Sequence, residues 1–488
     1  MFRESSKDGF SFKVYQGAQM TLLTMDLVQQ PAAGTFAGFT LEYTGPNAPR
    51  RPIKNLLNFA GTDSITSSVD SPFQAFKWVH FPGSYSQNPP PFGNWDYHAT
   101  PRFFDANKKL LPLDAGKTVT VTIPVGDFSK GGLEIGFTRA FLKSQAYASH
   151  YGAKTKLKPT GDWLFDMTKK AGTKNGHDFT YADMYVWLGY TARRQIYEPL
   201  DEALNDNTVE VEMFAYDLND PGVAQRCLDL AAAGRIRMIL DNAALHHVTQ
   251  PGKPPTEEDD FEVRFNAAAA AGFPRTEITF SPHDDTRAAE VLDEITALIQ
   301  KPSTQSVLFA VMEMGDTSTG TLIRALRDLH KNDSIYTYGV TDNSSGDISL
   351  YKPGRKNGLL IDATQAKREL PPPFKTEASL PGHAIHHKFV ITNFNRSTAR
   401  VWCGSSNLAL GGEKANGDNL ICITDDDVAT AFAIEAMRLT DHYNFRSVRE
   451  PDIGPPNQEP KKLDDTGAWV NKFFDPDDIR FVEREVLA

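Results

Sequence analysis

The first part of the chain consists of short, strand-like runs that are rich in hydrophobic residues. Such runs lie at residues 12–15, 20–27, 39–43, 76–81, 118–125 and 133–137, with Gly and Pro between them. The clearest is Thr-Val-Thr-Val-Thr-Ile at residues 118–123, which alternates strictly. Strands with one buried face show this period, and several of them separated by turn residues are typical of a sandwich. Residues 1–150 are therefore predicted to form an all-β sandwich domain.

After a polar, Lys-rich linker at residues 151–180, the spacing of hydrophobic residues becomes helical. Residues 181–205 carry apolar side chains near helical spacing, which predicts one long helix. Strand-like runs follow at residues 209–216 and 236–240, and Asp220-Pro221 opens a helix between them. This alternation of helices and strands predicts an α/β sheet.

The same order of elements returns in residues 286–449, with helices at 288–300 and 321–329 and strands at 306–312 and 334–340. The first copy, residues 181–285, is shorter: it ends in Ser281-Pro282-His283, where the second continues through a long loop to His386. His283 is interpreted as a turn residue. The predicted fold is multidomain, with the sandwich followed by an α/β domain of two unequal repeats around a mixed sheet. Residues 450–488 form a C-terminal tail whose amphipathic end is expected to pack.

Composition and charge narrow the class of protein. The chain has 488 residues, of which 40% are hydrophobic and 23% charged, as is ordinary for globular domains. No apolar run has the length of about 20 residues that a spanning helix needs, so a cytoplasmic protein is expected. Cys227, Cys403 and Cys422 lack metal-ligand spacing and are interpreted as buried, reduced thiols. The net charge of -11 weakens a nucleic-acid-binding interpretation without excluding it.

Candidate chemistry is concentrated in residues 386–407. Residues 388–392 are predicted to form a strand, on which His386 and Lys388 share one face and His387 takes the other. A second strand at residues 399–403 delivers Ser405 and Asn407 beside the first. An imidazole, an ammonium, a hydroxyl and a carboxamide thus converge, and this set of groups suits a phosphoryl group.

These residues resemble the signature of the phospholipase D superfamily, His-x-Lys-x4-Asp with a downstream Gly-Ser-x-Asn. His386 and Lys388 match the first part, and Ser405 and Asn407 lie in the second. Asn393 stands where the family has Asp, an acid that is mainly structural there. The resemblance covers roughly residues 180–446, which makes the two predicted repeats phospholipase D-like.

The resemblance implies a role for each residue. His386 would attack the phosphorus of a phosphodiester and form a phosphohistidine, without a metal or another cofactor. Asp418 would accept a hydrogen bond from the catalytic imidazole, with Glu413 as the alternative. The nonbridging oxygens of the phosphate would be bound by Lys388, Ser405 and Asn407.

Complete sites in this family pair two motifs, whereas this chain has one. Three alternatives follow: a homodimer in which two copies of His386 meet, a stand-in general acid, or an impaired protein that only binds phosphate. His246 and His247, at the end of a first-repeat strand, are the candidates for that acid. Phospholipid is favoured as the substrate because the chain is acidic and a sandwich is a kind of module that docks on membranes. Aromatic residues within 81–95 form either a packed loop or a rim for peripheral membrane contact, and a nuclease is the alternative function.

Overall fold

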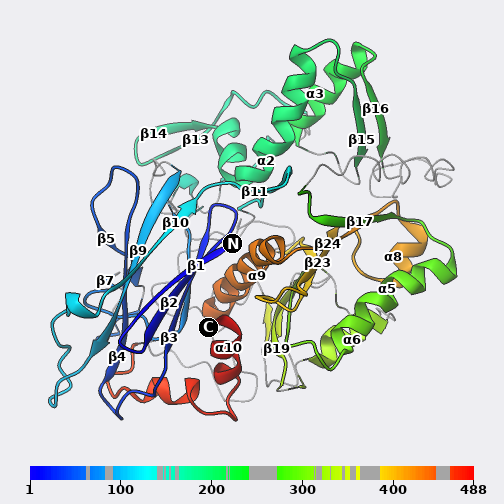
Figure 1. The fold of residues 1–488 in the computed structure, drawn as a ribbon. Coiled ribbons are helices and arrows are strands. Elements are labelled where there is room, and N and C mark those ends of the chain that lie inside the picture. The colour runs from blue at the N-terminus through cyan, green and yellow to red at the C-terminus, as the bar shows by residue number, and fades with distance from the viewer. Residues whose placement is uncertain are drawn as a thin grey trace.

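The computed structural model contains a β-sandwich and a large mixed sheet with one long helix between them (Figure 1). The unit formed by α2, α3, β15 and β16 lies at the top of this view, apart from the large sheet (Figure 1). The structure describes residues 1–55, 57–61, 66–82, 92–139, 147, 150–152, 155–159, 164–215, 218, 220–240, 272–312, 314, 321–329, 331–332, 334–342, 347–351, 359–362, 385–446 and 462–488.

The N-terminal domain contains two four-stranded antiparallel sheets, which confirms the prediction of a β-rich start. The first has the order β1 (Phe2–Lys7), β2 (Phe10–Gln16), β3 (Thr21–Leu27), β8 (Lys77–His80). The second has the order β10 (Val119–Val125), β9 (Gly93–Phe103), β4 (Phe36–Thr44), β5 (Arg51–Pro52). Smaller elements are β6 (Lys54–Asn55), β7 (Thr66–Ser67), η1 (Ala115–Lys117), β11 (Phe128–Lys130) and β12 (Leu133–Ile135). Both sheets contribute to one core, in which Phe12, Phe39 and Trp95 are almost completely buried.

The range predicted as a linker contains a hairpin, formed by β13 (Lys170–Lys174) and β14 (His177–Thr180). It leads into α2 (Tyr181–Asn205), which has the predicted bounds. Thr180 and Asp183 begin this helix with reciprocal side-chain and backbone hydrogen bonds, as in a capping box. Tyr190, with φ 49° and ψ -129°, breaks the helix into two segments.

The strands of the first repeat form a sheet of their own. β15 (Val211–Ala215) and β16 (Ile236–Leu240) pair in parallel, and α3 (Pro221–Ala232) connects them. Side chains from α2 and α3 cover one side of this pair, with Leu200, Cys227 and Leu230 buried. The prediction that both repeats surround one mixed sheet is therefore wrong for the described residues, because β15 and β16 pair with each other and not with the large sheet.

The large sheet has eight strands and is mixed, as predicted for the C-terminal domain. β18 and β19 are parallel, and every other neighbouring pair is antiparallel. β17 falls within the range assigned to the first repeat, yet it pairs with β24 and so belongs to this sheet. The strand order is β17 (Arg275–Phe280), β24 (Asn419–Thr424), β23 (Arg400–Gly404), β22 (Lys388–Thr392), β18 (Ser306–Val311), β19 (Tyr336–Asp342), β20 (Asp347–Tyr351), β21 (Leu359–Asp362).

Helices cover both faces of this sheet. α5 (Asp285–Gln300) and α6 (Thr321–Leu329) pack on one face, where Val390 and Phe309 are buried. α9 (Asp426–Arg446) packs on the other, against Phe389 and Ile391. Figure 1 shows α9 between the sandwich and the sheet, and Tyr15 of β2 belongs to the same core as α9. The sandwich and the α/β layer therefore share a core.

The C-terminal tail packs against both domains, as its amphipathic pattern predicts. Its elements are η3 (Ala468–Phe473) and α10 (Ile479–Leu487). Phe473 enters the sandwich core, and Leu487 enters the core around α9. Glu483 of α10 accepts a hydrogen bond of 3.1 Å from the Tyr336 hydroxyl and forms an ion pair with buried Lys77. Among the described helices, none is both long and apolar enough to cross a membrane.

Candidate active site

Several strands of the large sheet begin or end along the same edge of the sheet, which runs across the strand ends and not along an outermost strand. The backbone pairings Val311 with Lys388, Gly404 with Leu420 and Phe280 with Asn419 all lie at this edge. Lys388 begins β22, Gly404 ends β23 and Asn419 begins β24. Because these strands are antiparallel neighbours, segments that are distant in sequence leave the sheet side by side. The residues that precede or follow these strands, including those of the predicted site, therefore lie along this edge.

His386 and Lys388 lie next to each other at this edge, as the alternation of a strand predicts. The Lys388 ammonium lies 3.3 Å from Nε2 of His386 and donates to the His386 carbonyl oxygen at 3.0 Å. It also lies 3.6 Å from Sδ of Met312. The Lys388 side chain is buried, whereas the His386 side chain is exposed. The pair therefore offers an accessible imidazole beside a held positive charge.

His387 occupies the opposite face of the strand, also as predicted. Its Nε2 lies 3.2 Å from Oε1 of Glu435 on α9, and Nε of Arg438 donates to the same carboxylate at 2.7 Å. Glu435 is completely buried. Burial alone would raise the pKa of this carboxyl, but the charge of Arg438 and the hydrogen bonds from His387 and Arg438 outweigh it and lower the pKa to about 2.

A tight turn after β23 presents Ser405 and Asn407. The backbone amides of Ser405 and Ser406 both donate to the backbone carbonyl oxygen of Asn419 at 3.1 Å. The backbone amide of Asn419 donates in turn to Oγ of Ser405 at 3.0 Å. Gly404 is required here because its φ is 152° and a Cβ would lie 2.2 Å from that carbonyl oxygen. Oδ1 of Asn407 is buried and has no hydrogen-bond partner among the described residues. Because the unpaired atom is an acceptor, only the Nδ2 group of Asn407 can donate a hydrogen bond to a phosphate oxygen.

The two candidate orienting acids differ in their surroundings. Asp418 is buried, and its Oδ2 accepts from Nδ2 of Asn416 at 3.3 Å. Its amide donates to Oγ of Ser281 at 3.0 Å, which ties it to the end of β17. Glu413 lies on the short helix α8 (Leu410–Ala415) and accepts a hydrogen bond from the Ser406 hydroxyl.

The Glu413 carboxyl belongs to a small buried cluster that sequence reasoning missed. Burial, and to a smaller extent the charge of Asp418, raise the pKa of Glu413, although the bond from Ser406 acts the other way. Nε2 of His283 lies 3.8 Å from Oε2 of Glu413, and the His283 amide donates to the Glu413 carbonyl oxygen at 2.7 Å. His283 does lie in a turn, as interpreted, but that turn contacts the segment that supports Ser405 and Asn407. No local pattern signals this contact, because it joins β17 to α8.

His246 and His247 lie outside the described residues. No distance therefore relates either candidate general acid to His386.

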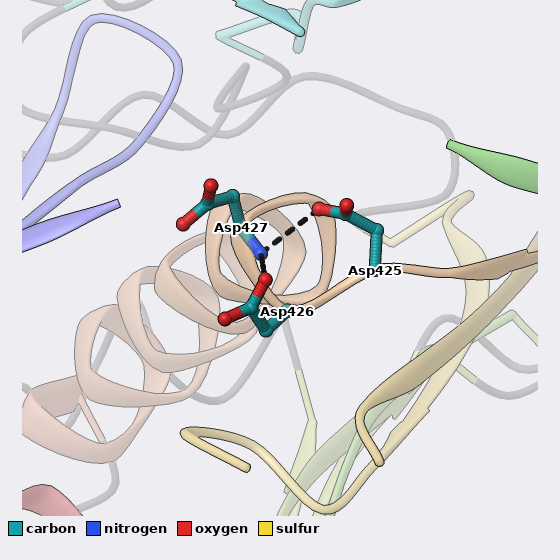
Figure 2. Close-up of side chains that lie close together, drawn as sticks. All are labelled: Asp425, Asp426 and Asp427. Carbon is teal, nitrogen blue, oxygen red and sulfur yellow. Dashed lines mark hydrogen bonds between the residues drawn. The ribbon is translucent and has the colours of Figure 1, made fainter. Parts of the chain in front are cut away.

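Another cluster, of three carboxylates, lies at the start of α9, away from the motif. Asp425 and Asp426 each accept from the Asp427 amide at 3.0 Å (Figure 2). Their carboxylates are close enough to hold a cation, but Lys130 of β11 lies 2.7 Å from Asp425 and 2.8 Å from Asp427. Although burial opposes it, these bonds raise the pKa of Lys130. The cluster therefore caps α9 and binds it to the sandwich domain.

Comparison with known proteins adds no family assignment. No protein-family model matches the chain, and no curated protein matches it in sequence.

Proposed function

We propose that this protein is a phosphodiesterase of the phospholipase D type, whose site is formed by residues 386–418. The observation that carries the proposal is the contact of 3.3 Å between Nε2 of His386 and the Lys388 ammonium at a strand edge. Ser405 and Asn407 of the Gly-Ser-x-Asn segment reach the same edge. A nucleophile, a fixed positive charge and neutral donors are the groups that transfer of a phosphoryl group requires. The resemblance in sequence and the mixed sheet with helices on both faces support the same proposal.

The proposed reaction has two steps. Nε2 of neutral His386 attacks the phosphorus of a phosphodiester, so that a P–N bond forms while the bond to the leaving oxygen breaks. The positive charge of Lys388 disfavours a second charge on the neighbouring imidazole and therefore favours its nucleophilic form. Water then attacks the phosphohistidine, which releases the phosphomonoester and frees His386. No metal ion takes part in either step.

The remaining polar groups stabilise charge and orient the nucleophile. Lys388, Ser405 and Asn407 bind the nonbridging oxygens, which carry more negative charge in the transition state. Asp418 orients the His386 imidazole, because Glu413 is already engaged by Ser406 and His283. The proton for the leaving alkoxide comes from a second acid, and three sources stay open: His386 of a second copy in a homodimer, His246, or His247.

Trapping the intermediate tests the nucleophile directly. Wild-type protein is mixed with a phosphodiester labelled in the phosphoryl group, quenched, and analysed by peptide mapping for acid-labile label on His386. We expect the label in wild-type protein and in His177→Ala, a control at an exposed histidine of β14. His386→Ala should lose it. Label that persists in His386→Ala, or its absence from wild-type protein, would overturn the nucleophile assignment.

The substrate class needs a separate comparison. Phospholipid is favoured because the chain is acidic, with a net charge of -11, and carries an N-terminal sandwich. Phosphatidylcholine vesicles and single- and double-stranded DNA are to be tested at matched concentrations of phosphodiester. Release of choline in excess of any DNA cleavage supports the lipid assignment, and cleavage of DNA alone favours the nuclease. Saturable binding of a diester without turnover supports the third candidate, an impaired phosphate-binding protein.

A further inference from the structure

The start of β22 is held from the face opposite the candidate site. His387 lies between the two proposed functional residues, and its imidazole contacts the Glu435 carboxylate at 3.2 Å. Neighbouring side chains on a strand point to opposite faces, so His386 and Lys388 project away from this contact. A group that fixes His387 therefore also fixes the backbone from which both functional side chains extend.

Glu435 is itself rigidly placed. It lies in the middle of α9, is completely buried, and receives hydrogen bonds from Arg438 one turn later, including one of 2.7 Å from Nε. The ring of Phe389 packs edge-on against Phe432 of α9, with 5.3 Å between the centroids. Helix and strand are thus joined by a polar contact between His387 and Glu435 and by an aromatic contact two residues further along the strand. Such a buried charge is costly unless it is paired, so the contact geometry is strongly constrained.

We propose that Glu435 is a positioning residue for phosphoryl transfer, which acts through His387 to set the relative placement of His386 and Lys388. This inference rests on the proposed function of the site. The physical reason is that an attacking atom and its charge partner must be held to within a fraction of an ångström, and loss of about 1 Å costs about 100-fold in rate. Glu435 does not touch the substrate, so it should influence the rate of the chemical step more than substrate binding.

The test compares Glu435→Gln, His387→Phe and the double variant. The measured quantities are the rate constant for label transfer to His386 at saturating diester and the KM. We expect Glu435→Gln to lower the rate constant by about 10- to 100-fold with KM changed by less than about twofold. If Glu435 acts through His387, the double variant should be no slower than the slower single variant. A double variant whose rate constant is lowered by the product of the two single effects would overturn the proposal.

A matched control separates positioning from a general loss of stability. Asp441 lies on the same helix, accepts from the Tyr338 hydroxyl and is within 3.9 Å of the Lys77 ammonium. Asp441→Asn therefore also weakens a polar contact of α9, but away from β22. Both variants should lower Tm, and only Glu435→Gln should slow label transfer. Equal slowing in both variants at equal loss of Tm would overturn a specific role for Glu435.

Amide hydrogen exchange provides a readout that does not depend on catalysis. We expect Glu435→Gln to increase exchange in a peptide spanning residues 386–392 by about 10-fold or more relative to wild-type protein, and Asp441→Asn to leave it unchanged. Unchanged exchange in Glu435→Gln would overturn the positioning role even if the protein is active. A wild-type protein without phosphodiesterase activity would overturn the proposed function, while the exchange result would still decide whether Glu435 anchors the strand.

Discussion

The two repeats of the α/β domain contain the same parallel strand pair and differ in what is added to it. β15 pairs with β16 as β18 pairs with β19, and a helix follows the first strand of each pair. In the second repeat β22 also pairs with β18, and β23 and β24 continue the sheet. All residues of the proposed site lie on or beside these additional strands. The comparison indicates that the strand–helix–strand unit is a scaffold and that the proposed chemistry depends on the added strands.

The two pairs also differ in how deeply they are buried. Every residue of β18 is buried, and Phe309 lies directly opposite Gly339. A Cβ at Gly339 would lie 2.2 Å from the Phe309 ring, so glycine provides the space for that ring. In the first repeat Met213 lies opposite Met238, and the exposed residue Arg237 forms an ion pair with Glu212. The β18–β19 pair is thus a core element with helices on both faces, whereas the β15–β16 pair is a partly covered surface element.

Removing the proposed nucleophile, His386, should produce the largest contrast between the repeats. His386→Ala is expected to lower the rate of diester hydrolysis by about 10⁴-fold or more, because the reaction loses its covalent route. Arg237→Ala in the first repeat removes an exposed ion pair and should leave the rate within about twofold. Initial rates on the preferred diester measure both. Loss of activity in Arg237→Ala would show that the first repeat takes part in the site.

Core truncation tests the difference in burial. Phe309→Ala in the large sheet is expected to lower the free energy of unfolding by about 3–5 kcal/mol, whereas Met213→Ala, at a partly buried position, should cost about 1–2 kcal/mol. Urea unfolding followed by circular dichroism measures both values. Equal costs would contradict the view that the first repeat is a surface element.

Acid unfolding should reveal the contribution of the buried ion pair between Glu435 and Arg438 in the large domain. The pKa of Glu435 is lowered from 4.5 to about 2, so its stabilising contribution is present above pH 4.5 and is lost as the pH falls through about 2. The contribution is on the order of 3 kcal/mol. Glu435→Gln should therefore flatten the dependence of unfolding free energy on pH across this range. Asp201→Asn, in a partly exposed pair with Arg226 of the first repeat, should lower the free energy of unfolding by less than about 1 kcal/mol. An equal loss of stability in Glu435→Gln and Asp201→Asn at neutral pH would contradict the comparison.

The smallest effect is expected at Asn393, at the end of β22 opposite the site. Asn393 adopts φ 56°, and its Oδ1 accepts a hydrogen bond from the backbone amide of Gln305 at 3.0 Å. Asp at this position keeps that acceptor and changes only the contact of 3.2 Å with Thr398. Asn393→Asp is therefore expected to change stability by less than about 1 kcal/mol and the rate by less than about twofold. A rate change of orders of magnitude would show that this turn is coupled to the chemistry.

Much of the local structure was predictable from the sequence. Helix α2 has its predicted bounds because apolar spacing and the Thr180 cap act locally. Strand β22 and the opposite orientations of His386 and His387 follow from the period of two. Strand β17 was not predicted, and its pairing with β24 carries no local signal, since pairing is decided by contacts between distant segments.

The environment of the site was less predictable for the same reason. Lys388 beside His386 followed from the motif, whereas Glu435, Arg438 and His283 lie on other elements and carry no local signal. The two strands of the first repeat and the helix between them were correctly expected, but their separation from the large sheet was not. Hydrophobic strands such as residues 211–215 indicate burial without indicating which sheet provides it.

The packing of β2 and β3 has a consequence for how the molecule unfolds. Phe12 and Leu23 point into the sandwich, while Tyr15 and Leu22 point into the core around α9, and the Leu487 carbonyl accepts a hydrogen bond from Tyr15 at 3.0 Å. The sheet formed by β1, β2, β3 and β8 therefore packs against two hydrophobic cores, one on each of its faces. Heat should then melt both domains in a single cooperative transition. Excision of the sandwich should expose the core around α9, so the α/β layer is not expected to fold as an autonomous domain.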